Sequence, residues 1–280
     1  MSQVLRHAGR SHSIRRAMWK RVLHLWRKFR RPRVTGDEIV RTLHALGVQR
    51  SELIQVHSSL SSFGYVEGGA GAVVDALLGT VGPDGSVLVP TFNHGAEEIF
   101  DLHASPSHNG AISEAFRHRP EAVRSFHPTH AYAAIGPLAA ELCANHLEAG
   151  TFTMDSPLGK LARRGGWIIL LGVGMNRCTA AHLGECNARA HCIGWGQQPR
   201  WVRDPQTGQV HCVRGDLWRN GDCLIEWNPL EKRMRERGLI TDGQVGRCHV
   251  MRMRAQDVID VTYEMTQELC PRCPTMPLAQ

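Results

Sequence analysis

The stretch LIQVHSSLSSFGYVEGGAGAVVDALLGTVGPDGSVLVPT (residues 53–91) decides the fold class. Its apolar start predicts a strand over residues 53–57, and a helix is predicted over residues 72–80 after a run of glycines. The Gly-Pro-Asp-Gly turn at residues 82–85 then precedes a second strand over residues 86–91. A strand, a helix and a strand joined by short turns form a βαβ unit, which indicates α/β architecture.

The chain on either side of this unit continues the alternation of helices and strands. Thr35 and Glu38 have the spacing of a capping box and predict a helix that ends at Gly47. The fully apolar segment 167–172 is typical of a central, buried strand. Polar, glycine-punctuated residues 195–222 predict a β-rich excursion. Helices are further predicted over residues 138–146, 158–164 and 180–190, with helix and short strand over residues 228–269.

The composition is that of a globular protein, with 42% hydrophobic and 21% charged residues. No apolar run approaches the ~18 residues that a membrane-spanning helix needs. The basic first residues are not followed by the apolar stretch of a secretory signal. The chain has nine cysteines, an odd number, and its length together with the missing signal favours reduced thiols over a disulfide framework, in a cytoplasmic protein.

The net charge of +7 is unevenly distributed along the chain. Residues 1–36 contain eleven Lys and Arg and no Asp or Glu, whereas the remainder is net acidic. Apolar residues at helical spacing predict a basic amphipathic arm over residues 1–33, which contacts an anionic membrane surface weakly, packs on the body or is poorly ordered. An acidic body suits a cationic substrate better than nucleic acid. The predicted organisation is this arm, a main domain over residues 34–268 and a tail over residues 269–280.

Two motifs contain residue types that bind phosphates or carbonyl groups. The first is HSSLSSFG (57–64) followed by GGAG (68–71). Small residues after a strand, and the start of a helix, allow backbone N–H groups to approach a ligand. The second is RSFHPTHAYAAIG (124–136), in which Arg124 could bind a phosphate through two hydrogen bonds.

A third motif, TAAHLGE (179–185), has the residue types of a general base. His182 and Glu185 are three residues apart and therefore share a face of a helix. A carboxylate beside an imidazole fixes its tautomer and increases its basicity, as a general base requires. The motif follows the predicted central strand, at the end of which α/β enzymes gather ligands.

The cysteines allow two metal-site interpretations. Cys178, His182 and Cys186 recur at four-residue intervals, but three ligands at this spacing are not a usual zinc site. Cys270 and Cys273 form a C-x2-C pair. Further zinc ligands would have to come from Cys212, Cys223 or Cys248. Packed cysteines without a metal are favoured over both.

Taken together, four stretches resemble the aminoglycoside 3-N-acetyltransferase family, whose fold differs from that of the common small acetyltransferases. They are residues 56–92, RSFHPTHAYAAIG (124–136), SPLGKLARRGGWIILLGV (156–173) and TAAHLGE (179–185), in an order and spacing that fit over about residues 35–265. The resemblance implies a single α/β body in which a central mixed sheet is flanked by helices. It also implies that acetyl-CoA is bound and that its acetyl group passes directly to an amine.

Residue roles follow from this resemblance. The residues expected to line the path of acetyl-CoA are Ser58, Ser59, Leu60, Gly68, Gly69, Arg124 and Ser125. His182 is expected to be the general base and Glu185 its orienting carboxylate, with Thr179 beside them to hold substrate or thioester. No metal is expected. Members of the family tend to have Ser where Ala131 stands here, so the acceptor could differ from an antibiotic.

Three interpretations of the function compete. The first is acetyl transfer from acetyl-CoA to an amine of an aminoglycoside or related amino sugar, with acyl transfer to a non-antibiotic biosynthetic amine as its variant. In the second, Cys178 or Cys186 beside His182 forms an acetyl-enzyme. In the third, the basic arm and the Cys270–Cys273 pair belong to a zinc-stabilised protein that binds nucleic acid or a membrane surface. The resemblance favours the first, an acetyltransferase of antibiotic resistance.

Overall fold

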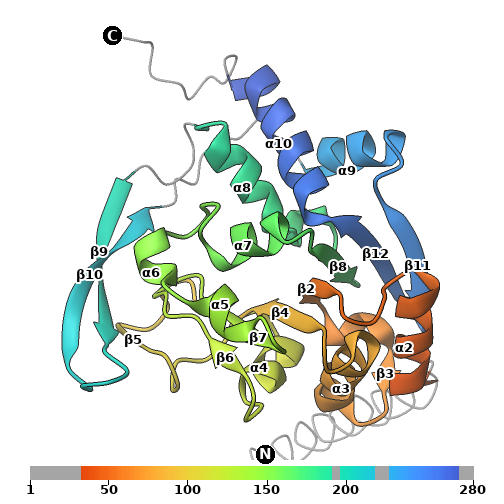
Figure 1. Cartoon of the computed structure of the whole chain (residues 1–280), viewed down its shortest axis with the longest axis horizontal. Helices are drawn as coiled ribbons and strands as arrows, with labels where there is room; N and C mark the ends of the chain where they lie inside the picture. The colour runs from red at the N-terminus through yellow and green to blue at the C-terminus, as the bar shows by residue number, and fades with distance from the viewer. Residues whose placement is uncertain (1–32, 191–195, 218–226, 271–280) are drawn as a thin grey trace, which may run out of the picture.

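The computed structural model describes residues 33–190, 196–217 and 227–270. All but the last residue of the predicted basic arm, and Cys273 of the C-terminal pair, lie outside these residues. A seven-stranded mixed sheet passes through the centre of the described part, with helices on both faces (Figure 1). The single α/β body expected from the sequence is thereby confirmed.

The central sheet contains β2 (Leu53–Ser58), β4 (Ser86–Pro90), β6 (Val123–Arg124), β7 (Tyr132–Ile135), β8 (Trp167–Leu171), β11 (Thr241–Val245) and β12 (Cys248–Arg254). Their order is β11-β12-β8-β2-β4-β7-β6. β2 is parallel to both β4 and β8, and the other neighbouring pairs are antiparallel. β2, β4 and β8 lie in the three segments that the sequence predicts as strands.

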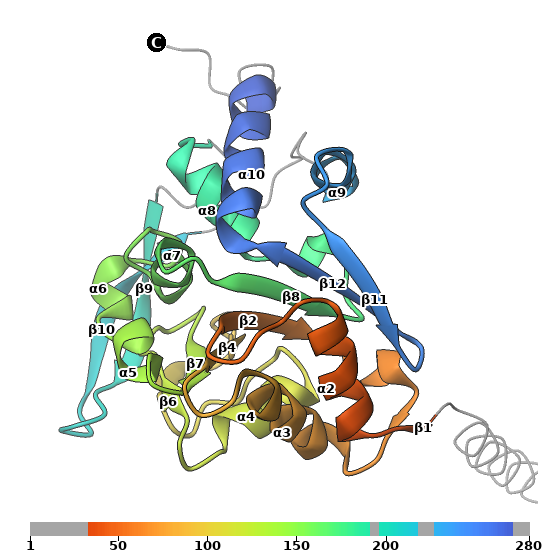
Figure 2. The ribbon, with the colours of Figure 1, turned by 45° about the vertical axis from the view of Figure 1, so that its right-hand side comes forward.

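Two layers of helices cover the sheet. They are α2 (Gly36–Ala45), α3 (Gly69–Val81) and α4 (Ala111–Arg117) on one face, and α5 (Ala139–Cys143), α7 (Pro157–Arg163), α8 (Ala180–Asn187), α9 (Trp227–Glu236) and α10 (Ala255–Leu269) on the other (Figure 2). Each layer closes its own apolar core, because Ile54 and Val56 of β2 face the first and Leu53 faces the second. Alternate side chains of one strand therefore stabilise both layers.

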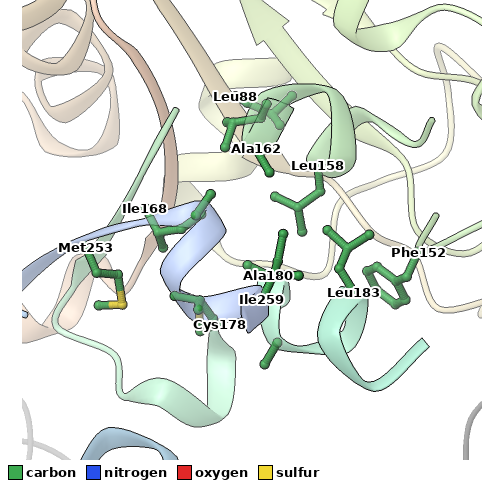
Figure 3. Packing of buried hydrophobic residues seen from close by; sticks show 14 of the residues in the cluster. Leu88, Phe152, Leu158, Ala162, Ile168, Cys178, Ala180, Leu183, Met253 and Ile259 are labelled. Atoms are coloured by element: carbon green, nitrogen blue, oxygen red, sulfur yellow. The ribbon is translucent and has the colours of Figure 1, made fainter. Parts of the chain in front are cut away.

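Helix α8, which contains most of the TAAHLGE motif, packs closely against α10. Ala180 and Leu183 of α8 lie in the same apolar cluster as Ile259 of α10 (Figure 3). Gly184 permits this approach, because an added Cβ would lie 2.4 Å from the carbonyl oxygen of Ile259. The packing fixes the helix that carries the predicted general base.

Local sequence signals determine where several helices begin and end. The predicted capping box of α2 is present, since Thr35 Oγ1 accepts a hydrogen bond from the backbone N–H of Glu38 and a Glu38 carboxylate oxygen accepts one from the backbone N–H of Thr35. The single helix predicted over 138–146 is wrong. The chain forms two short helices there, α5 and α6 (His146–Ala149), because Ala144 has an extended backbone with a ψ of 140° and Asn145 has a φ of 55°.

The predicted β-rich excursion forms a separate small sheet. β9 (Gly196–Arg203) and β10 (Val210–Leu217) are antiparallel, and β9 also pairs in parallel with β5 (Ile99–Asp101). The remaining elements are β1 (Arg33–Val34), β3 (Tyr65–Val66) and the 3₁₀-helices η1 (Leu60–Phe63) and η2 (Met175–Arg177). Within the described ranges, no helix has both the length and the apolar character needed to cross a membrane.

Candidate active site

A cavity of about 800 Å³ opens where β2 ends and the chain turns into η1. Ser58, Ser59 and Leu60 line it, and so does Gly69 at the start of α3. These four residues are among those expected to contact acetyl-CoA. The other lining residues are His57, Ser61, Gly64, Tyr65, Val66, Pro90, His94, His108, Asn109, Gly110, Ala111, Val173 and Arg177.

The charged and imidazole side chains that line the cavity are all basic. They are the guanidinium of Arg177 and three imidazoles, and none of the described residues that line the cavity is Asp or Glu. Arg177 is exposed and lies in η2, just after the central strand β8. A cavity with a cation and no carboxylate suits an anionic ligand such as a phosphate ester.

Three side chains from separate segments meet at the wall of the cavity. The Nε2 atom of His57 lies 3.1 Å from Oγ1 of Thr179 and 3.4 Å from the Thr179 backbone nitrogen. The hydroxyl of Tyr132, at the start of β7, lies 3.2 Å from the same Oγ1. Thr179 is the N-cap residue of α8, yet its hydroxyl makes no capping hydrogen bond, since it contacts His57 and Tyr132 instead.

Burial determines the protonation of this network. His57 is 5% exposed, and burial, with the nearby His182 and Arg177, lowers the pKa of its imidazole to about 3. Burial also raises the pKa of the Tyr132 hydroxyl. At neutral pH the His57 ring is therefore uncharged, and Tyr132 keeps its proton.

The predicted contact between His182 and Glu185 is present one helical turn after Thr179. Nδ1 of His182 lies 2.6 Å from Oε2 of Glu185, and Glu185 is 4% exposed. The ring of Phe152 lies 5.1 Å from the His182 ring, between centroids, while the His182 side chain keeps 28% of its exposure. Because the carboxylate engages Nδ1, a proton taken up by this imidazole would go to Nε2. His182 does not itself line the cavity. The contact between His57, which lines the cavity, and Thr179, which lies three residues before His182, connects the His182–Glu185 pair to the cavity.

Further imidazoles are buried beside this pair. The ring of His130 lies 5.3 Å from that of Phe152, and the rings of His127 and His146 lie 4.6 Å apart. Burial lowers the pKa of His130 and that of His146 well below the ordinary value of a histidine. These histidines belong to the core of the fold, and all but His146 come from the 124–136 motif.

Three residues expected to contact acetyl-CoA lie outside the lining of the cavity, among them Arg124. Gly68 is the N-cap residue of α3, with a φ of 77°. Ser125 is fully buried, and its Oγ lies 2.8 Å from Nδ1 of His146. Ala131, where the family tends to have Ser, is also fully buried and packs beside Phe100. Gly68, Ser125 and Ala131 are therefore part of the fold around the cavity and do not line it.

Arg124 holds a loop in place instead of reaching the cavity. Its guanidinium donates hydrogen bonds of 2.6–3.0 Å to the main-chain carbonyl oxygens of Thr91, Leu102 and Ser105, and it lies over the ring of Phe100. Burial lowers its pKa to about 10, so it remains charged. Arg124 and Ser125 do not line this cavity, because their polar groups are engaged inside the fold, and their predicted contact with acetyl-CoA stays a prediction.

The cysteine interpretations gain no support from the geometry. In the described part of the chain, no group of three or more His, Cys, Asp or Glu side chains could hold a metal ion. Cys178 is buried, and burial raises the pKa of its thiol to about 12, which opposes the thiolate that an acetyl-enzyme route requires. Cys223 and Cys273, two of the proposed zinc ligands, lie outside the described residues.

Three residues of the site have no role assigned from the sequence, namely His57, Tyr132 and Arg177. His57 is the first residue of the HSSLSSFG motif, and Tyr132 lies within the RSFHPTHAYAAIG motif. The place of His57 at the end of a predicted strand is a signal that could have singled it out. Arg177 falls between motifs, where nothing in the sequence separates it from any other exposed arginine.

Comparison with known proteins gives consistent matches. The aminoglycoside 3-N-acetyltransferase family matches residues 55–267. The chain is 35% identical over 178 residues to aminoglycoside N(3)-acetyltransferase VIII of Streptomyces fradiae, covering 56% of this chain and 62% of that enzyme, less than two thirds of its length. It is 32% identical over 263 residues to aminoglycoside N(3)-acetyltransferase III of Serratia marcescens, covering 82% of this chain and 96% of that enzyme. A solved variant of aminoglycoside acetyltransferase AAC(3)-IVa, in complex with a gentamicin, has a TM-score of 0.76 and 26% identity over 85% of this chain and 90% of that chain.

Proposed function

Because the chain belongs to the aminoglycoside 3-N-acetyltransferase family, we propose that it transfers an acetyl group from acetyl-CoA to an amine of an aminoglycoside or a related amino sugar. The named relatives are N(3)-acetyltransferases, and one similar structure contains a gentamicin. The observation that carries the proposal is the 2.6 Å contact between His182 and Glu185, one helical turn from the Thr179 residue that contacts the cavity wall.

The cavity beside η1 is the proposed binding site of acetyl-CoA. Its volume of about 800 Å³ is in the range of cofactor pockets, roughly 300–1,000 Å³. Ser58, Ser59 and Leu60 would line the pantetheine arm, and Gly69 offers a backbone without a side chain at the start of α3. Arg177 supplies the positive charge that the phosphates of the coenzyme require.

The chemistry needs one base and one leaving thiol. The amine nitrogen attacks the thioester carbon, so that an N–C bond forms and the carbonyl π electrons move onto oxygen. Nε2 of His182 takes the proton that the amine releases, and Glu185 stabilises the resulting imidazolium. When the tetrahedral intermediate collapses, the C–S bond breaks, and the CoA thiolate leaves with the bonding electrons and takes up that proton. A base of this kind contributes about 10²–10⁴-fold to the rate.

The test is the release of CoA thiol from acetyl-CoA with a panel of aminoglycosides and simple amino sugars. We expect turnover by the unmodified protein with at least one acceptor and a loss of about 10²–10⁴-fold in kcat for His182→Ala. The matched control is His249→Ala, because His249 lies 2.8 Å from the carboxylate of Asp242 in an exposed pair on β11 and β12. Turnover by His182→Ala close to that of the control would remove His182 as the base, and no turnover with any acceptor would contradict the proposed activity.

A further inference from the structure

The hydrogen bonds of His57 fix the position of its proton. Its Nε2 atom lies 3.4 Å from the backbone nitrogen of Thr179 in a geometry in which that N–H donates to the ring. A backbone N–H can only donate, so Nε2 must accept through its lone pair. In an uncharged imidazole the other nitrogen then carries the hydrogen. The tautomer of His57 is therefore the one with the proton on Nδ1.

The Nδ1–H group of His57 has no hydrogen-bond partner among the described residues. The two hydrogen bonds of this side chain both involve Nε2. Nδ1 is also not among the buried polar atoms that lack a partner, so it keeps contact with solvent, and His57 is one of the residues that line the cavity. Burial holds the ring neutral at physiological pH. The cavity wall thus presents one oriented N–H donor that carries no net charge.

We propose that the Nδ1–H of His57 donates a hydrogen bond to the carbonyl oxygen of the acetyl thioester and to the oxyanion that forms on that oxygen. The proposal rests on the proposed acetyl transfer and names a further catalytic residue for it. No proton leaves His57 in this role, because the hydrogen stays on Nδ1 while the carbonyl π electrons move onto oxygen and return when the C–S bond breaks. A neutral imidazole can polarise a carbonyl group in this way.

The surroundings of His57 fit this role. Its other nitrogen is held by Thr179, whose hydroxyl is also in contact with Tyr132, so the orientation of the ring is fixed from two further segments. Thr179 lies three residues before His182 on the same chain segment. The proposed donor and the proposed base are therefore joined through one residue, which keeps their separation constant during the reaction.

A competing role for His57 is purely structural, in which its Nε2 only positions Thr179. Two substitutions, each of which replaces one ring nitrogen by an amide group, separate the roles. His57→Asn places its amide group near the site of Nδ1 and retains a donor there, but it cannot reach Thr179. His57→Gln places its amide group near the site of Nε2, where the amide oxygen can still accept a hydrogen bond from Thr179. It has no hydrogen-bond donor at the site of Nδ1.

The experiment compares His57→Asn and His57→Gln in the acetyl-CoA assay, after circular dichroism has established that each is folded. Loss of one oxyanion donor typically lowers kcat by about 10²–10³-fold. We expect His57→Gln to show this loss with little change in the KM for acetyl-CoA, and His57→Asn to retain substantially more kcat. A kcat of His57→Gln near that of the unmodified protein, or above that of His57→Asn, would overturn the proposal.

An independent readout uses the unmodified protein. Infrared difference spectra of acetyl-CoA labelled with ¹³C at the acetyl carbonyl report hydrogen bonding to that oxygen. We expect the carbonyl band to move to lower frequency when acetyl-CoA binds, and the shift to be lost in His57→Gln. If acetyl-CoA binds and is turned over but its carbonyl band does not move, the role of His57 is wrong and the acetyltransferase activity stands. If acetyl-CoA neither binds nor reacts, the proposed function fails first and the role of His57 falls with it.

Discussion

His182 and Glu185 lie on one face of α8, with Nδ1 of the imidazole 2.6 Å from Oε2 of the carboxylate. The two side chains differ in their surroundings, because Glu185 is 4% exposed whereas the side chain of His182 keeps 28% of its exposure. A buried carboxylate that contacts a partly exposed imidazole stabilises the positive charge that the ring acquires when it takes up a proton. The arrangement therefore suits an acceptor amine that approaches from the exposed side of the ring.

The charge of Glu185 is the first feature to test. Glu185→Gln keeps the size of the side chain and an amide oxygen that can accept from Nδ1, but it removes the charge. We expect kcat to fall by about 10²-fold, at the lower end of what a general base contributes. The measurement is the rate of thiol release at saturating acetyl-CoA. Asp242→Asn, in the exposed pair with His249, is the matched control, and an equal effect in both variants would contradict the role of Glu185.

The sequence predicts those parts of the structure that depend on neighbouring residues. The strand over 53–57, the strand over 86–91 and the capping box at Thr35 follow from local periodicity and turn chemistry, and each is present. The contact between His182 and Glu185 is of the same kind, because a spacing of three on a helix brings the side chains together.

Contacts between distant segments could not be predicted in this way. His57 and Thr179 are 122 residues apart, and no local pattern indicates that they touch. Arg124 is a second example, since its residue type suggests a phosphate ligand, and the sequence does not reveal that the loop around residues 102–105 supplies carbonyl oxygens to its guanidinium. The break between α5 and α6 depends on the extended backbone of Ala144 and the positive φ of Asn145, which the apolar pattern of the segment does not reveal.

Arg177 should contribute to the binding of acetyl-CoA and little to the chemical step. We expect Arg177→Gln to raise the KM for acetyl-CoA by about 10-fold, since a charged hydrogen bond at an exposed position is worth roughly 1.5 kcal/mol. The kcat should change little. S-acetylpantetheine lacks the phosphates of the coenzyme, so its KM should be the same in both proteins. Arg41→Gln, on the exposed face of α2, is the control, and an unchanged KM for acetyl-CoA in Arg177→Gln would contradict the assignment.

Arg124 should contribute to stability and not to coenzyme binding. Arg124→Gln removes hydrogen bonds to three carbonyl oxygens and leaves part of them unsatisfied in a half-buried position. We expect the free energy of unfolding to fall by about 2–4 kcal/mol in urea titrations, with the KM for acetyl-CoA unchanged in the folded fraction. Lys232→Gln breaks an exposed ion pair with Glu236 and should change the stability by less than about 0.5 kcal/mol. A raised KM without a loss of stability in Arg124→Gln would restore the phosphate-binding role.

The buried imidazoles predict a loss of stability in mild acid. Burial lowers the pKa of His57 to about 3 and holds the pKa of His130 and that of His146 well below the value of about 6.5 that a histidine has in the unfolded chain. Below pH 6.5 the unfolded chain therefore binds more protons than the folded protein. The stabilisation is fully present above pH 6.5 and is lost as the pH falls towards the folded values, by up to about 1.4 kcal/mol per pH unit for each histidine.

Urea unfolding between pH 7.5 and 5.5 measures this dependence, and His146→Asn isolates one contribution to it. Asn retains a polar group near Nδ1, which contacts Ser125, but it does not titrate. We therefore expect the stability of His146→Asn to fall less steeply with decreasing pH than that of the unmodified protein, by up to about 1.4 kcal/mol per pH unit. Leu142→Ala, in the apolar core of the same layer, should lower the stability at every pH without changing the slope. Identical slopes for the unmodified protein and His146→Asn would contradict a neutral, buried imidazole at this position.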